Sequence, residues 1–261
     1  MLRGIESATK GMLGVMELND VIANNLANVN SAGFKETKLI FKNIHDSAVN
    51  ALDKSVKGNE TKQVGSLSVG SVVDAAVIDF SQGGLRITGN PLDVAINGKG
   101  FFEVQMPDGS SAYTRNGSFI LTDNGGLTTI NGEPVMGEGG QIQLDLKQYQ
   151  TKDITISGDG VIHLDKEEVG KLRIVDFANK AGMKTIGSAL FVPGDGQNSS
   201  PHSAENFQVV QGAIESSNSN IIQTMVNSIA ATRMYETLSN IIQAESRTLD
   251  KTINQVARLR Q

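Results

Sequence analysis

The feature that most constrains this fold is a heptad row of apolar residues at each end of a 261-residue chain. Near the N-terminus the row follows alternating intervals of three and four residues, with Asn19 at its one polar position. Such a row is typical of a helix that packs along another helix. The helix is expected to stop at Ser31–Gly33, because glycine is the preferred left-handed cap. The apolar or small members of the row are Ile5, Ala8, Met12, Val15, Ile22, Leu26 and Val29.

A second helical row is predicted in residues 216–261. It begins after the sequence SSNSN, which offers Ser and Asn capping residues. Its phase shifts slightly near Tyr235, and basic residues near its end suit the negative pole of the helix dipole. The row consists of Ile222, Met225, Ile229, Tyr235, Leu238, Ile242, Glu245, Leu249, Thr252, Val256 and Leu259.

The middle of the chain has the pattern of a β-rich domain. Short apolar runs such as PLDVAI, GFFEVQM and SFILT are separated by Asn-Gly, Asp-Gly and Gly-Gly pairs, which supply the backbone angles of tight hairpins. We therefore predict an α+β protein: helical segments 1–44 and 216–261, a connector at 45–66, and an antiparallel sandwich or barrel-like module at 67–215. The polar, aperiodic connector is expected to be extended or partly disordered.

Composition excludes several classes of function. The net charge of −5 and the scarcity of aromatic residues argue against nucleic-acid binding. The absence of cysteine excludes thiol chemistry, and His45, His163 and His202 are too scattered to suggest a metal site. No apolar stretch is long enough to span a membrane, and the N-terminus lacks the pattern of a cleaved signal peptide. We expect no cofactor and no catalytic residue, since no carboxylate pair, Ser-His-Asp set or phosphate loop stands out.

Asn24, Asn25 and Asn28 are unusual so close to a helix end, because asparagine is a poor helix former. Buried amides can fix the register between helices. These three project in at least two directions, which favours a helix with several neighbours. We predict that the apolar rows and these asparagines contact other copies of the chain, which order the helical ends. The alternatives are local capping of the helix end by Asn28 or Asn30, and an intramolecular helix pair packed on the β module.

Four segments resemble the bacterial flagellar axial family of rod, hook and hook-associated proteins. They are NDVIANNLANVNSAGFK, PLDVAINGKGFFEV, AYTRNGSF and QGAIESSNSNIIQTMVNSIAATRMYE, and the likeness covers nearly all of the chain apart from residues 45–66. The motif residues singled out by the resemblance are Gly33, Phe34, Lys35, Leu92, Asp93, Gly100, Phe101, Phe102, Tyr113, Arg115 and Gly117.

The resemblance implies a structural subunit that is exported unfolded by the flagellar type III export apparatus, without a cleaved signal peptide. Its terminal helices would line a helical tube as a coiled-coil domain, with the β module outside. The expected place is the periplasm-spanning rod of the basal body, which transmits torque to the hook. The implied partners are further copies, neighbouring rod subunits, the hook protein, and the P and L ring proteins.

The position within the rod is less sharply indicated by the sequence. The stretch SVGSVVDAAVIDFSQGGL (68–85) resembles distal rod proteins, although these more often carry Gly-Thr-Gly where this chain has Val69-Gly70-Ser71. The stretch GEPVMGEGGQIQL (132–144) resembles proximal rod proteins. We favour the distal rod, with a proximal rod or hook-like subunit as the alternative, and residues 45–66 as a candidate for rod rigidity. The rivals from other classes are an enzyme and a binding module that does not polymerise.

Overall fold

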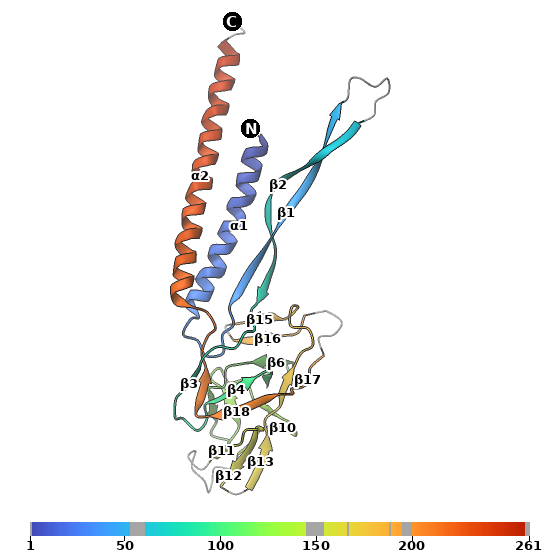
Figure 1. The fold of residues 1–261 in the computed structure, drawn as a ribbon. Coiled ribbons are helices and arrows are strands. Elements are labelled where there is room, and N and C mark those ends of the chain that lie inside the picture. Colours follow the sequence, from blue (N-terminus) through green and yellow to red (C-terminus); the bar gives the residue numbers. More distant parts are fainter. Residues whose placement is uncertain are drawn as a thin grey trace. The chain divides into compact units, whose positions relative to one another are not determined.

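The chain forms two compact units in a computed structural model that describes residues 2–52, 61–144, 154–165, 167–187, 189–194 and 200–258. We call Met1–Asn24, Lys38–Val77 and Ile222–Gln261 the helical unit, and Asn25–Thr37 with Ile78–Ile221 the β unit. The expected α+β class is confirmed, with helices at both ends of the chain and antiparallel strands between them (Figure 1).

The helical unit contains two helices and one strand pair. Helix α1 spans Leu2–Ala27 and α2 spans Ile221–Arg258, while β1 (Thr37–Leu52) pairs with β2 (Thr61–Ile78). The helices contact each other through a small apolar cluster centred on Val15, Ile22 and Ala231. This matches the intramolecular helix pair that the sequence left open.

The strand pair shows that the described parts of the predicted connector belong to two strands. Residues 45–52 continue β1 and residues 61–66 begin β2, whereas residues 53–60 lie outside the described part. These described residues are extended, as expected, but their backbone belongs to a two-stranded sheet. The absence of apolar periodicity concealed it, because a strand pair needs cross-strand hydrogen bonds more than a buried face. The helical unit therefore includes residues 67–77, which we had assigned to the β module.

The β unit is built around a six-stranded antiparallel sheet in the order β15-β16-β6-β5-β14-β17. The remaining strands form the sheet β11-β12-β13 and the pairs β18-β4, β19-β3, β7-β8 and β10-β9. The bounds are β3 Leu85–Ile87, β4 Val94–Gly98, β5 Phe101–Gln105, β6 Ser111–Thr114, β7 Phe119–Leu121, β8 Leu127–Thr129, β9 Met136–Gly137, β10 Gly140–Gln141, β11 Ile154–Ile156, β12 Val161–Leu164, β13 Glu167–Lys171, β14 Ile174–Asp176, β15 Lys184–Ile186, β16 Leu190–Val192, β17 His202–Ser203, β18 Phe207–Gln211 and β19 Ala213–Glu215.

Two buried clusters hold the β unit together, one on each side of strand β5. Phe102 and Val104 belong to a large aliphatic cluster, whereas Phe101 belongs to a smaller cluster rich in aromatic rings. In the smaller cluster Phe101 meets Phe80 edge to face, with ring centroids 5.4 Å apart. Successive side chains of a strand point to opposite faces, so the dipeptide Phe101-Phe102 supplies both clusters.

Candidate functional site

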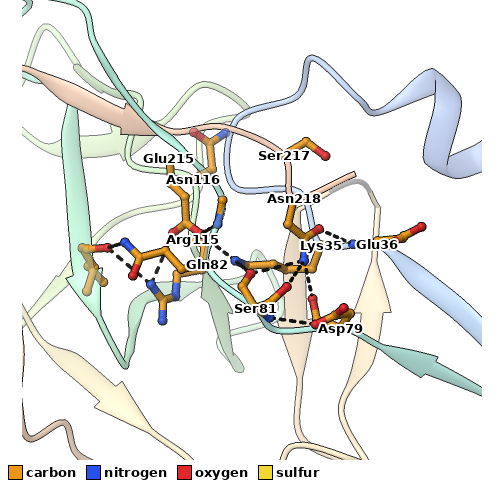
Figure 2. A network of polar contacts seen from close by, with 12 residues as sticks. Lys35, Glu36, Asp79, Ser81, Gln82, Arg115, Asn116, Glu215, Ser217 and Asn218 are labelled. Atoms are coloured by element: carbon orange, nitrogen blue, oxygen red, sulfur yellow. Dashed lines mark hydrogen bonds and ion pairs between the residues drawn. The ribbon is translucent and has the colours of Figure 1, made fainter. Parts of the chain in front are cut away.

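The segments that follow α1 and precede α2 are joined to each other inside the β unit, as Figure 2 shows. The amide of Gly33 donates to the carbonyl of Glu215 at 2.8 Å, and the amide of Asp79 donates to the carbonyl of Glu36 at 2.8 Å. A further bond runs from Ser216 N to Gly84 O at 2.8 Å. Three stretches that are distant in sequence therefore share one set of backbone hydrogen bonds.

Three charged side chains lie buried at the centre of this junction, and we call Lys35, Arg115 and Glu215 the junction cluster. Lys35 Nζ lies 2.5 Å from Glu215 Oε1, and Arg115 Nη1 lies 3.3 Å from Glu215 Oε2. The side chains of Lys35 and Glu215 are fully buried, and that of Arg115 is 4% exposed. Burying charges is costly unless they are paired and hydrogen-bonded, so the cluster depends on complete pairing.

Backbone groups supply further hydrogen-bond partners to the junction cluster. Lys35 Nζ donates to the carbonyl of Ser81 at 2.7 Å, and the amide of Gly83 donates to Glu215 Oε1 at 2.9 Å. Arg115 Nη2 donates to the carbonyl of Gly98 at 2.9 Å. Glu215 thus accepts from three donors in three different segments.

Burial dominates the electrostatics of the two cations. It lowers the pKa of Lys35 below its ordinary value, although Glu215 opposes this by attraction and hydrogen bonding. It likewise lowers the pKa of the Arg115 guanidinium, again against the pull of Glu215. The guanidinium also lies over the ring of Phe101, 5.2 Å from its centroid. One carboxylate facing two desolvated cations forms a structural clamp.

Two asparagine side chains extend this clamp by replacing missing backbone partners. Asn218 accepts from the amide of Glu36 at 2.7 Å and donates to the carbonyl of Asp79 at 2.7 Å. Asn25 donates to the carbonyl of Thr37 at 2.8 Å and accepts from the amide of Thr37 at 3.0 Å. The amide of Asn25 is therefore satisfied within its own chain, and its contact with a neighbouring copy stays a prediction.

The other two asparagines of the N-terminal segment lie in different environments. Asn24 is exposed on α1, whereas Asn28 is half-buried and accepts a hydrogen bond from the hydroxyl of Ser31 at 3.2 Å. This bond joins two side chains in the turn that follows α1. The side chain of Asn24 is exposed, and its predicted contact with another copy stays a prediction.

The family-motif residues are brought together in the β unit. Phe34 and Lys35 are buried, and Gly33 has a φ of 68° in close contact with the backbone of Asn116. A side chain on Gly117 would collide with the carbonyl of Val94. Phe101, Phe102, Tyr113 and Arg115 are buried, Gly100 is buried, Leu92 packs against the large cluster, and Asp93 accepts from Asn90 Nδ2.

The sequence did not reveal the roles of Glu215 and Asn218. We had assigned the SSNSN segment to helix capping alone, and Glu215 precedes it at the end of an apolar strand. A glutamate that follows Ala213 and Ile214 without a turn signal is the one available hint, because an acid is seldom buried without a cation. Its partners lie 180 and 100 positions away.

The predicted self-assembly residues of α1 fall on its inner face or beside it. Val15 and Ile22 are buried, and Ile5, Met12, Leu26 and Val29 are half-buried. Gly11 faces Leu238 of α2, so the small residue allows close approach of the two helices. The N-terminal row therefore serves contacts within the chain, at least in part.

Helix α2 has two faces of different character. Its inner row is Thr224, Ala231, Leu238, Ile242 and Leu249, which are buried or half-buried. The predicted residues Met225, Ile229 and Tyr235 are off this row and 48%, 57% and 40% exposed. Val256 lies within α2, whereas Leu259 is outside the described residues. The row that we predicted for α2, with its shift of phase near Tyr235, is therefore divided between an inner and an outer face.

Half a turn from the inner row, α2 carries an exposed apolar strip in its first half. The strip consists of Ile222, Val226 and Ile229, which are spaced four and three residues apart, followed by Arg233. Val226, Ile229, Arg233 and Met234 also line a shallow groove on this helix. Exposed apolar strips of this kind mark interaction surfaces.

The described residues offer no sign of metal chemistry or membrane insertion. Among them, no three His, Asp or Glu side chains gather as metal ligands. Neither α1 nor α2, over its described length, is long and apolar enough to cross a bilayer. The buried junction cluster and the exposed apolar faces of the helices are features typical of a subunit of a larger assembly.

Comparison with known proteins identifies the class of that subunit. Residues 95–164 match the flagellar hook protein FlgE/F/G D1 domain, and residues 210–256 match the flagellar basal body rod FlgEFG protein C-terminal domain. The chain belongs to the FlgE/F/G family of flagellar rod and hook proteins, as the sequence motifs predicted.

Individual relatives narrow the comparison to rod proteins. The flagellar basal-body rod protein FlgG of Buchnera aphidicola is 37% identical, over 92% of this chain and 94% of the relative. FlgG of Borreliella burgdorferi is 35% identical, over 95% of this chain and 97% of the relative. The rod protein FlgF of Caulobacter vibrioides is 32% identical over 85% of each chain. These matches are to rod proteins and confirm the expectation of a structural protein rather than an enzyme.

Proposed function

We propose that this chain is a structural subunit of the distal part of the bacterial flagellar rod. The main support for this proposal is the similarity of the chain to FlgG over almost its full length. A second support is that both helices expose apolar side chains on their outer faces. In this proposal the helical unit joins further copies in a coiled-coil-like tube, and the β unit forms the outer layer. The junction cluster keeps the two helix-bearing segments at a fixed separation.

The proposal extends to partners and location. The subunit would contact neighbouring rod subunits and the hook protein along the axis, and the P and L rings around it. It would be exported unfolded by the flagellar type III apparatus and act where the rod crosses the periplasm. The strand pair β1–β2 now replaces the connector as the candidate for rod rigidity, because a hydrogen-bonded ribbon is stiffer than a free linker.

Deleting the gene in its own bacterium tests the assignment. We expect non-swimming cells whose isolated basal bodies end before the distal rod and carry no hook, and restoration by the wild-type gene. Cryo-electron microscopy of the restored basal bodies should place the chain in the distal rod. Normal basal bodies after deletion would contradict the proposal.

A proximal rod position is the second candidate, favoured by the 32% identity to FlgF. The same cryo-electron micrographs distinguish a distal from a proximal position in the rod. A chain located next to the membrane-proximal end of the rod, with basal bodies truncated there after deletion, would support the proximal position.

A further inference from the structure

The outer face of α1 differs in charge from the outer strip of α2. Leu13 is 61% exposed and lies on the side of α1 opposite the buried residues Ala8, Val15 and Ile22. Met16 is 49% exposed and lies between that side and α2, where it and Asp20 border a groove beside Tyr235. Glu17 and Asp20 are exposed on the same side as Leu13, because residues three, four and seven positions apart share a helix face. This acidic apolar face consists of Leu13, Met16, Glu17 and Asp20.

The corresponding face of α2 is apolar and basic. Arg233 continues the strip of Ile222, Val226 and Ile229, and lines the groove with Val226 and Ile229. Within the described residues, none of Glu17, Asp20 and Arg233 takes part in a salt bridge. Each face thus has exposed apolar side chains beside charges that lack an ionic partner in the described chain.

We propose that the acidic apolar face of α1 binds the basic apolar strip of α2 on a second copy of this chain. This inference rests on the proposed function and specifies its self-assembly contact. The charges are opposite, and each face presents apolar side chains for the other to cover. The inner faces of both helices are already occupied by each other, so the outer faces are the ones available to another copy.

The consequence is a contact between two different surfaces. Such a heterologous contact leaves one free α1 face and one free α2 strip on every pair, and can therefore repeat without limit. A two-fold contact, in which identical faces meet, would stop at a dimer. The proposed pairing therefore accounts for a tube made of many copies.

Cysteine cross-linking tests this pairing without background, because the chain has no cysteine. Cells producing a chain with Leu13→Cys and Ile229→Cys would be oxidised and their basal bodies isolated. We expect a ladder of disulfide-linked oligomers beyond the dimer. The matched control replaces the second site by Ile120→Cys, an exposed isoleucine of the β unit, and should give no ladder.

A mixture of the two single variants distinguishes contacts within and between copies. Cells that produce Leu13→Cys together with Ile229→Cys on separate chains should yield cross-linked pairs, whereas either variant alone should stay uncross-linked. Basal bodies that contain the doubly substituted chain without any ladder would overturn the pairing and leave the proposed function intact. Absence of the wild-type chain from basal bodies would overturn both.

Charge exchange supplies an independent measurement. Arg233→Glu should reduce swimming at least tenfold, and adding Glu17→Arg and Asp20→Arg to the same chain should restore most of it. Lys99→Glu, an equal change of charge at an exposed site of the β unit, should leave swimming unchanged. Failure of the compensating change to restore assembly, with Arg233→Glu defective, would contradict the ionic part of the pairing.

Discussion

At the scale of single residues, the stability of the β unit depends on Glu215. It is fully buried and pairs with both Lys35 and Arg115, so its removal leaves two cations without their anion. Breaking a buried ion pair from one side costs more than an exposed pair is worth, because the remaining charge stays desolvated. This asymmetry gives the junction cluster a distinct mutational signature.

We expect Glu215→Gln to lower the free energy of unfolding by about 3–5 kcal/mol. Lys35→Met should cost less, because Glu215 keeps Arg115 and the amide of Gly83. Urea denaturation of the full chain measures both. The control is Lys171→Met, which breaks the exposed pair with Glu138 and should cost under about 1 kcal/mol. Equal costs at Lys171 and Glu215 would contradict the clamp.

The lowered pKa of Asp176 leads to a prediction about the stability of the protein at acidic pH. Burial raises its pKa, but hydrogen bonds from Lys180 and the Phe177 backbone, with the positive charge of Lys180 and His202, hold it below the ordinary 3.8. A carboxyl with a depressed pKa stabilises the fold above 3.8, and this contribution is lost as pH falls through its folded-state pKa. The stability difference between wild type and Asp176→Asn should therefore be largest near neutral pH and shrink below pH 3.8 in urea titrations. A constant difference from pH 7 to pH 2 would contradict this.

At the scale of elements, α1 and α2 each present an inner face to the partner helix and an outer face to solvent. We expect Ile22→Lys, on the inner face, to weaken the pairing of the helices, because a buried side chain would become charged. Hydrogen exchange by mass spectrometry should then quicken in α1 and α2 while the β unit stays protected. Leu13→Lys, at an exposed position of the same helix, serves as the control and should leave exchange in the isolated chain unchanged.

The helices and most turns could be predicted from sequence because their signals are local. Heptad spacing indicates a helix and Asn-Gly pairs indicate a hairpin turn, and both patterns involve residues that are only a few positions apart. Residues 45–52 and 61–66 of the strand pair β1–β2 were assigned to a connector, since their polar sequence lacks alternation. The junction cluster could not be derived, because the burial of Lys35 depends on residues 81 and 215, whose proximity no local pattern encodes. The sequence did not show which residues of α2 face α1, because this helix carries apolar residues on both its inner and its outer face.

At the scale of the whole molecule, the division into two units predicts separable folding. The fragment 25–221 contains the complete junction cluster and both buried clusters of the β unit. We expect it to unfold cooperatively on heating, as judged by near-ultraviolet circular dichroism. The shorter fragment 78–212 lacks Lys35 and Glu215 and leaves Arg115 unpaired. It should melt at least 10 °C lower or fail to fold, and equal melting temperatures would contradict the role of the cluster.

The bond between Lys35 and Glu215 joins positions 180 residues apart. Closing so long a loop is entropically expensive and is repaid only when the flanking strands have already paired. A polypeptide that emerges gradually from a narrow passage, in either direction, therefore stays unfinished until more than four-fifths of it has appeared. In the export that we propose, the junction cluster closes only after this point, so the β unit stays incomplete while most of the chain is in transit.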